Sequence, residues 1–246
     1  PAEDVTITAN FKRLPPPEGV DTTLDFTHYP IRYFATDGAG CYVGVGEKGA
    51  VIRSVDGGYT WTQAWSGVNI YPDFYGAKAI AYGNGKYIAI GSNGDVVSSK
   101  DGLHWKSIRH LIPFEYVGTS LSDIAYGSFG DKSMFIITDG YYAYTSVDGE
   151  KWDAVNMNLT DGFANVIEFG ENRCVAAGLK VIAYSDDGEN WTQIPINDIA
   201  INDFSYDISR FQCYSLAYGN GKFMAGLGSH VIISEDGINW FLKSTS

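Results

Sequence analysis

One short motif, which recurs five times, constrains the fold of this chain more than any other feature. The motif is Ser-x-Asp-Gly followed after a few residues by Trp, and its tryptophans are 44, 47, 39 and 49 residues apart. A period of about 40 to 50 residues is typical of propeller blades and related arrays, in which each unit buries its apolar surface against the next. The motif residues are Ser54, Asp56, Gly57 and Trp61; Ser99, Asp101, Gly102 and Trp105; Ser146, Asp148, Gly149 and Trp152; Ser185, Asp187, Gly188 and Trp191; and Ser234, Asp236, Gly237 and Trp240.

Each repeat is long enough for four short strands, and the second copy illustrates them. Its first two segments, 79–83 and 87–90, are apolar runs typical of strands that are covered on both faces. Asn84-Gly85 joins these segments, and this pair favours a two-residue hairpin. A valine-rich third segment follows, and the fourth begins at Trp105. The pattern predicts an all-β propeller of five four-stranded blades, with six blades as the alternative.

The repeats also suggest where the domains begin and end. Residues 1–31 carry no motif, although 5–8 alternates like a strand before the three prolines at 15–17. This segment is expected to form a short N-terminal arm, an extra strand or part of a sixth blade, and an arm could join copies into an oligomer. The propeller is expected to span 32–246, with blades at about 32–65, 78–109, 122–155, 165–194 and 215–243.

The chemistry of the motif is local to its turn. A short carboxylate accepts hydrogen bonds from backbone N–H groups just ahead of it, and glycine supplies a left-handed backbone conformation. The tryptophan opens the next strand and can pack its ring between blades. One aspartate per repeat supplies too few oxygen ligands for calcium, and the four histidines have no metal-ligand spacing. We therefore expect a structural role for these residues, with no metal and no cofactor.

Long connections between repeats are the candidate ligand-binding surface. They span 62–77, 106–121, 153–164 and 192–214, and each joins the last strand of one blade to the first strand of the next. Connections longer than the minimum often carry function. Flat rings beside carboxylates suit a sugar or a protein partner, whereas the alternative is that the rings only fill space in and between the blades. The candidate ligand-binding residues are Tyr71, Phe74, Tyr75, Phe114, Tyr116, Asp203, Tyr206 and Arg210.

Charge and cysteine content narrow the classes of partner. The formal net charge is −12, which argues against nucleic acid and anionic membranes, because both attract clustered Lys and Arg. No apolar stretch is long enough to span a bilayer, so membrane insertion is not expected. An odd number of cysteines without a pairing motif is a poor disulfide framework. Cys41, Cys174 and Cys213 are therefore expected to act as small buried hydrophobes.

Through these motifs, roughly residues 32–243 resemble the Asp-box, or bacterial neuraminidase repeat, β-propellers. The best-known members are sialidases, and for an active member the resemblance implies three arginines around the substrate carboxylate, a Tyr–Glu nucleophile pair and an aspartate acid/base. Only Arg109 and Arg210 fall clearly in the long connections, and residues 29–32 have the wrong order for the family's Arg-Ile-Pro motif. The chain is therefore not expected to be an enzyme, with a sialidase-like glycoside hydrolase as an alternative.

These features favour a non-catalytic binding or scaffold module. The repeats look like those of phage-borne and bacterial non-catalytic members of the family. The leading hypothesis is a structural or receptor-binding component of a bacteriophage particle, located in the virion after assembly in the host cytoplasm. Its partners would be other structural proteins of the assembly, a cell-surface glycan, or both. A secreted or periplasmic bacterial assembly or glycan-binding factor is the alternative.

Overall fold

Five four-stranded antiparallel sheets make up the described part of the chain. The structure is a computed structural model that describes residues 30–63, 76–114, 120–199, 210–228 and 230–243. Within every sheet the strands are neighbours in the order of the sequence, so each sheet is a simple meander. We call the sheets blades 1 to 5 in chain order. The predicted all-β fold of five four-stranded blades is confirmed.

The strands have the following bounds. Blade 1 contains β1 (Ile31–Thr36), β2 (Tyr42–Gly46), β3 (Val51–Ser54) and β4 (Thr62–Gln63). Blade 2 contains β5 (Ala77–Gly83), β6 (Lys86–Gly91), β7 (Val96–Ser99) and β8 (Trp105–Ser107). Blade 3 contains β9 (Asp123–Phe129), β10 (Lys132–Thr138), β11 (Tyr142–Ser146) and β12 (Asp153–Asn156). Blade 4 contains β13 (Phe163–Phe169), β14 (Cys174–Leu179), β15 (Val181–Ser185) and β16 (Thr192–Ile194). Blade 5 contains β17 (Ser215–Gly219), β18 (Lys222–Leu227), β19 (His230–Ser234) and β20 (Phe241–Lys243).

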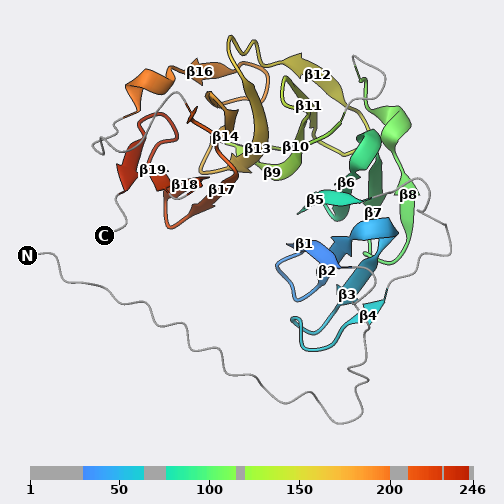
Figure 1. Ribbon diagram of the computed structural model, residues 1–246. Coiled ribbons are helices and arrows are strands. Elements are labelled where there is room, and N and C mark those ends of the chain that lie inside the picture. The colour runs from blue at the N-terminus through green and yellow to red at the C-terminus, as the bar shows by residue number, and fades with distance from the viewer. Residues whose placement is uncertain (1–29, 64–75, 115–119, 200–209, 229, 244–246) are drawn as a thin grey trace, which may run out of the picture.

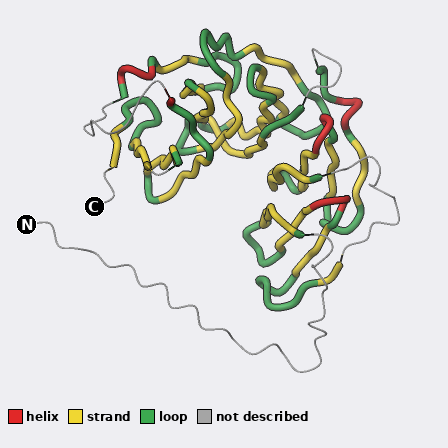
Figure 2. Tube along the Cα trace, in the orientation of Figure 1, coloured by secondary structure: helices red, strands yellow, loops and turns green. Residues whose placement is uncertain are grey.

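Turns rather than helices join these strands. The helical elements in the described ranges are single 3-10 turns, η1 (Glu47–Gly49), η2 (Ser92–Gly94), η3 (Arg109–Leu111) and η4 (Ile196–Asp198), which Figure 2 shows in red. The hairpin predicted at Asn84-Gly85 forms, with φ of 44° and 69° at its two residues. Positive φ at both positions matches the right-handed twist of the strands that they connect. None of the described helical elements is long and apolar enough to cross a membrane.

The long connections are shorter than the sequence suggested. Their first residues belong to the fourth strands, because β8, β12 and β16 extend to Ser107, Asn156 and Ile194. Phe163 is likewise the first residue of β13 rather than part of a loop. These segments are short and mix polar with apolar residues, so the sequence pattern does not fix where each fourth strand ends. Their pairing with the third strand of each blade sets their length.

Consecutive blades pack through two faces that recur along the chain. The leading face of a blade points to the next blade, and at the first junction it contributes Val43 and Val45. The trailing face points to the preceding blade, and at the same junction it contributes Tyr87, Ala89 and Trp105. The other three junctions between consecutive blades repeat this arrangement. The hydrophobic core is therefore a series of interfaces between blades, which is how repeat proteins bury apolar surface.

The blades follow one another along an arc, with blades 1 and 5 at its two ends (Figure 1). Their first strands, β1, β5, β9, β13 and β17, line the inside of the arc, and each contacts the next. The three cysteines are unpaired; Cys174 is fully buried between blades 3 and 4, and Cys213 between blades 4 and 5. This arrangement brings one strand from every blade to a shared central space.

Candidate functional site

The motif turns, which we call box turns, are closed by their own hydrogen bonds. In blade 5, the backbone N–H of Gly237 donates to Ser234 Oγ at 2.8 Å, and Ser234 Oγ donates to Asp236 Oδ1 at 3.0 Å. The same Asp236 oxygen accepts the backbone N–H groups of Ile238 and Asn239 at 2.8 and 2.7 Å. Equivalent bonds close the box turns of blades 2, 3 and 4. The box turn of blade 1 has one extra residue, so the backbone N–H of Thr60, four residues after Asp56, donates to Asp56 Oδ1 at 2.9 Å.

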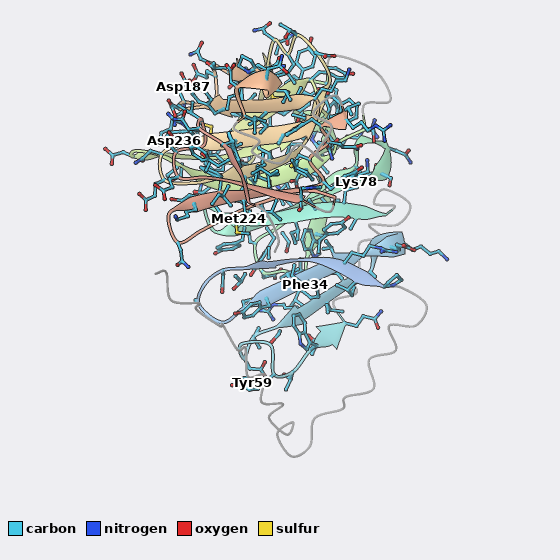
Figure 3. All side chains as sticks on the ribbon, turned by 60° about the vertical axis from the view of Figure 1, so that its left-hand side comes forward. Phe34, Tyr59, Lys78, Asp187, Met224 and Asp236 are labelled. Carbon is cyan, nitrogen blue, oxygen red and sulfur yellow. The ribbon has the colours of Figure 1, made fainter. Side chains whose placement is uncertain are left out.

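In these hydrogen bonds, the carboxylate oxygens of the box aspartates serve as acceptors. Burial opposes ionisation of Asp236, but the backbone and side-chain donors of Asn239, the backbone N–H of Ile238 and the Ser234 hydroxyl outweigh it and hold its pKa near 2. In the described ranges, no three His, Cys, Asp or Glu side chains are grouped as metal ligands. Asp187 and Asp236 lie at the same side of the molecule, opposite Lys78 (Figure 3). The box turns therefore form a structural rim.

Two of the eight candidate ligand-binding residues lie in the described ranges. Phe114 is partly buried and its ring meets Tyr144 edge-on at 5.3 Å between centroids, so it packs against blade 3. Arg210 is exposed and lies in the connection between blades 4 and 5. The two residues belong to different connections, and the structure shows no site that joins them. Tyr71, Phe74, Tyr75, Tyr116, Asp203 and Tyr206 lie outside the described residues.

The inner strands line an open central cavity to which all five blades contribute, and we call it the channel. Its volume is about 580 Å³, and its wall includes residues of β1, β5, β9, β13 and β17. Most wall residues are alanines, branched aliphatics and tyrosines. Two carboxylic acids, Asp123 and Glu168, stand in this wall on the neighbouring strands β9 and β13.

Asp123 is held by backbone donors of two blades. Its Oδ2 accepts the backbone N–H of Ile167 at 3.0 Å, and its Oδ1 accepts its neighbour Ile124 N–H at 2.9 Å. Burial raises the pKa of Asp123 to about 7, although these two donors oppose the rise, and the nearby Glu168 adds to it. The carboxyl group therefore titrates near neutral pH instead of being permanently charged.

Glu168 follows Ile167 on β13 and faces the same channel. Its Oε1 accepts the backbone N–H of Phe169 at 2.9 Å, and burial raises its pKa. Among the described residues, neither channel acid forms an ion pair. Arg32 reaches the channel from β1, but its guanidinium is paired with Glu47 at 2.7 Å. The channel thus presents two poorly solvated acids without a cationic partner from the described chain.

This arrangement suits the binding of a positively charged group. A cation placed between the two carboxyls would favour their ionised forms and would compensate the burial that now disfavours them. Sequence reasoning missed both residues because it searched the long connections. A signal was nevertheless present, because Glu168 stands where the other four repeats have alanine, at Ala35, Ala81, Ala125 and Ala217.

Comparisons with known proteins agree with this architecture. No protein-family model matches the sequence, and no curated protein matches it significantly. Among solved structures, YCF48 bound to a D1 peptide superposes with a TM-score of 0.61 at 19% identity, covering 89% of this chain and 68% of that one. Virginiamycin B lyase from Staphylococcus aureus gives a TM-score of 0.67 at 10% identity, covering 87% of this chain and 69% of that one.

Enzymes and binding proteins both occur among these structures. The GH74 xyloglucanase from Xanthomonas campestris has a TM-score of 0.61 at 14% identity and covers 85% of this chain, which spans only 38% of the enzyme. At such low identities the likeness concerns the fold alone. The chain therefore has the fold of a β-propeller, and its activity has to be argued from its own residues.

Proposed function

We propose that this chain is a binding or scaffold module, and that its central channel holds a protein or peptide segment through a basic side chain. The observation that carries the proposal is the pair Asp123 and Glu168, whose pKa values are raised in a channel of about 580 Å³. A lysine or arginine side chain is long enough to insert its apolar stem among the alanines and tyrosines of the wall while its charged end meets the acids. One of the similar solved structures, YCF48, is itself bound to a peptide, the D1 peptide.

The charge of the whole chain supports this ligand class. A protein with a formal net charge of −12 attracts cationic segments and speeds their encounter. Because the pKa of Asp123 is about 7, a cationic ligand would displace a proton from it. Binding should therefore strengthen as the pH rises through neutrality.

A matched pair of peptides tests the proposal. A panel of fluorescent peptides would carry lysine or the neutral, nearly isosteric norleucine at one central position, and binding would be followed by anisotropy. We expect lysine peptides to bind more tightly, and Asp123→Asn or Glu168→Gln to weaken that binding by about tenfold or more, since a charge-assisted hydrogen bond contributes about 1.5 to 3 kcal/mol. Asp131→Asn, at an exposed position of the β9–β10 hairpin, is the control. Equal binding of the two peptides, or no effect of both channel variants, would rule the channel out.

Three finer predictions rest on sequence resemblance. Membership of the Asp-box repeat propellers is supported by five box turns with a common hydrogen-bond pattern. A role in a bacteriophage particle, with a virion location, stays a prediction, as does its secreted or periplasmic alternative. Glycan binding also stays a prediction, because six of its eight candidate residues lie outside the described ranges. A glycan array with the Phe114→Ala and Arg210→Ala variants would test the remaining two.

A further inference from the structure

Three of the four junctions between consecutive blades repeat the same close approach, whereas at the junction of blades 3 and 4 the box glycine Gly188 lies against Met134. The box glycine of one blade lies directly against a fully buried aliphatic side chain on the leading face of the preceding blade. This holds for Gly102 against Val43, for Gly149 against Ile88 and for Gly237 against Val175. The three aliphatic residues occupy equivalent positions in the second strands of blades 1, 2 and 4, because each pairs with the residue before the box serine.

The two ends of the arc leave both halves of this contact uncovered. Met224 of blade 5 is the equivalent of Val43, Ile88 and Val175, and its side chain is 52% exposed whereas theirs are 0% exposed. In blade 1, Gly58 takes the place of the box glycine, because its N–H donates to Ser54 Oγ at 2.9 Å, and it is partly exposed whereas the box glycines of blades 2 to 5 are buried. Within the described ranges, blade 1 therefore does not cover blade 5.

Further apolar side chains surround each half of the contact. On blade 1, Phe34 is 53% exposed and Tyr59 is 57% exposed, although the residues equivalent to Phe34 in blades 2, 3 and 4 are buried. On blade 5, Phe241 is 53% exposed, and it is separated from Met224 by Ile233 of the strand between them. Figure 3 labels Phe34 and Tyr59 on blade 1 and Met224 on blade 5. We call these surfaces the trailing end face (Phe34, Gly58, Tyr59 and Trp61) and the leading end face (Lys222, Met224 and Phe241).

At two of these junctions, those of blades 2 and 3 and of blades 4 and 5, a polar contact accompanies the apolar one. Lys86 donates to the backbone carbonyl of Asp148 in the next box turn, and Arg173 donates to that of Asp236. Lys222 follows the last Asn-Gly hairpin as Lys86 follows its own, so the two lysines are equivalent. Among the described residues, Lys222 pairs instead with Glu235 of its own blade at 2.6 Å.

We propose that the leading end face of one copy binds the trailing end face of a second copy, head to tail. The occupant is a second copy because each end face needs what the other provides: Met224 fits a box glycine, and Lys222 fits the carbonyl of Asp56. The two surfaces are different, so the contact is heterologous, and it extends into chains of copies unless the rotation closes a ring. This interface is separate from the channel acids and does not depend on them.

Site-directed crosslinking tests the order of the copies. Lys222→Cys would be prepared in one sample and Val55→Cys in another, both on a Cys41→Ser background to remove the only partly exposed cysteine. A short bismaleimide should join two chains when the samples are mixed and should join none when each is treated alone. Sedimentation equilibrium of the wild-type chain without crosslinker should show a weight-average mass that rises with protein concentration.

A charge placed in the contact provides the second measurement. Met224→Asp should abolish the concentration-dependent rise in mass, whereas Val147→Asp, at a residue that is 51% exposed in the box turn of blade 3, should preserve it. Circular dichroism would verify that both variants are folded. If a chain that carries both cysteines crosslinks only within itself, blades 1 and 5 of one chain contact each other. If the mixed samples give no crosslink and the mass stays that of a monomer, the end faces bind a different partner or none. Either result would overturn the proposal.

Discussion

At the scale of a single residue, Asp123 makes the stability of the fold depend on pH. Its pKa is about 7 in the folded chain against 3.8 for an ordinary aspartate. Between these values the unfolded chain releases a proton that the folded chain keeps, so the contribution of Asp123 to the free energy of unfolding falls as the pH rises from about 4 to about 7. Asp123→Asn should remove this slope. Thermal melts of both proteins across that range, with Asp131→Asn as the control, would show whether the slopes differ.

The absolute stability of Asp123→Asn is a poorer readout than its slope. Asparagine offers one carbonyl oxygen in place of two, so one of the N–H donors of Ile124 and Ile167 loses its acceptor, at a cost of about 1 to 3 kcal/mol. That cost is nearly independent of pH, whereas the ionisation penalty disappears below the folded pKa. Parallel slopes for the variant and the wild-type chain would contradict the assignment of the shift to Asp123.

At the scale of the element, the box turn depends on its carboxylate. Asp148 accepts the backbone N–H groups of Glu150 and Lys151, each at 2.8 Å. Asp148→Ala leaves these donors without their charged acceptor and should lower the free energy of unfolding by about 2 kcal/mol. Val147→Ala, in the same turn but 51% exposed, should change it by less than about 0.5 kcal/mol. Urea titrations of the two variants would compare them, and equal losses would refute a special role for the carboxylate.

Two glycines with the same backbone conformation separate turn strain from blade packing. Gly85 and Gly102 have φ of 69° and 73°, but a Cβ at Gly85 meets open space whereas one at Gly102 lies 2.5 Å from Val43 Cγ2. Gly85→Ala should therefore cost about 1 kcal/mol for the left-handed backbone. Gly102→Ala should cost about 2 kcal/mol more, because the buried, β-branched Val43 has no other rotamer to take. Similar losses of unfolding free energy for both variants in urea titrations would show that the side chains at the junction rearrange to accept the added methyl group.

The sequence predicted the elements of this fold better than its site. Asn84-Gly85 and the five box turns mark chain reversals through local chemistry, so they could be read without knowing what packs against them. The channel acids could not be found in that way, since Asp123 and Glu168 come into one cavity wall only after blades 3 and 4 are stacked. The comparison of repeats did contain the signal, because an acid replaces alanine at Glu168, but only the structure shows that this position lines a channel.

At the scale of the whole molecule, the packing of blade on blade that builds the core leaves one apolar face uncovered at each end of the described arc. Each blade contributes a leading and a trailing face, so an arc of blades always ends with one of each. In closed propellers the last blade covers the first and no such faces remain. In the described ranges, the exposure of Met224 and Phe34 leaves one face of each kind open, at blades 5 and 1.

The net charge should control how strongly the end faces of different copies associate. Each copy carries a formal charge of −12, so two copies repel one another at low ionic strength, while the apolar contact of Met224 and Phe34 is insensitive to salt. Raising sodium chloride from about 50 mM to about 500 mM shortens the Debye length to a few ångströms and should increase the weight-average mass in sedimentation equilibrium. Met224→Asp should stay monomeric at both salt concentrations, whereas Val147→Asp, which adds the same charge outside the end faces, should follow the wild-type chain. A mass that falls with salt would instead mean that the contact of Lys222 with the box turn of blade 1 dominates the association, since that attraction is screened while the apolar one is not.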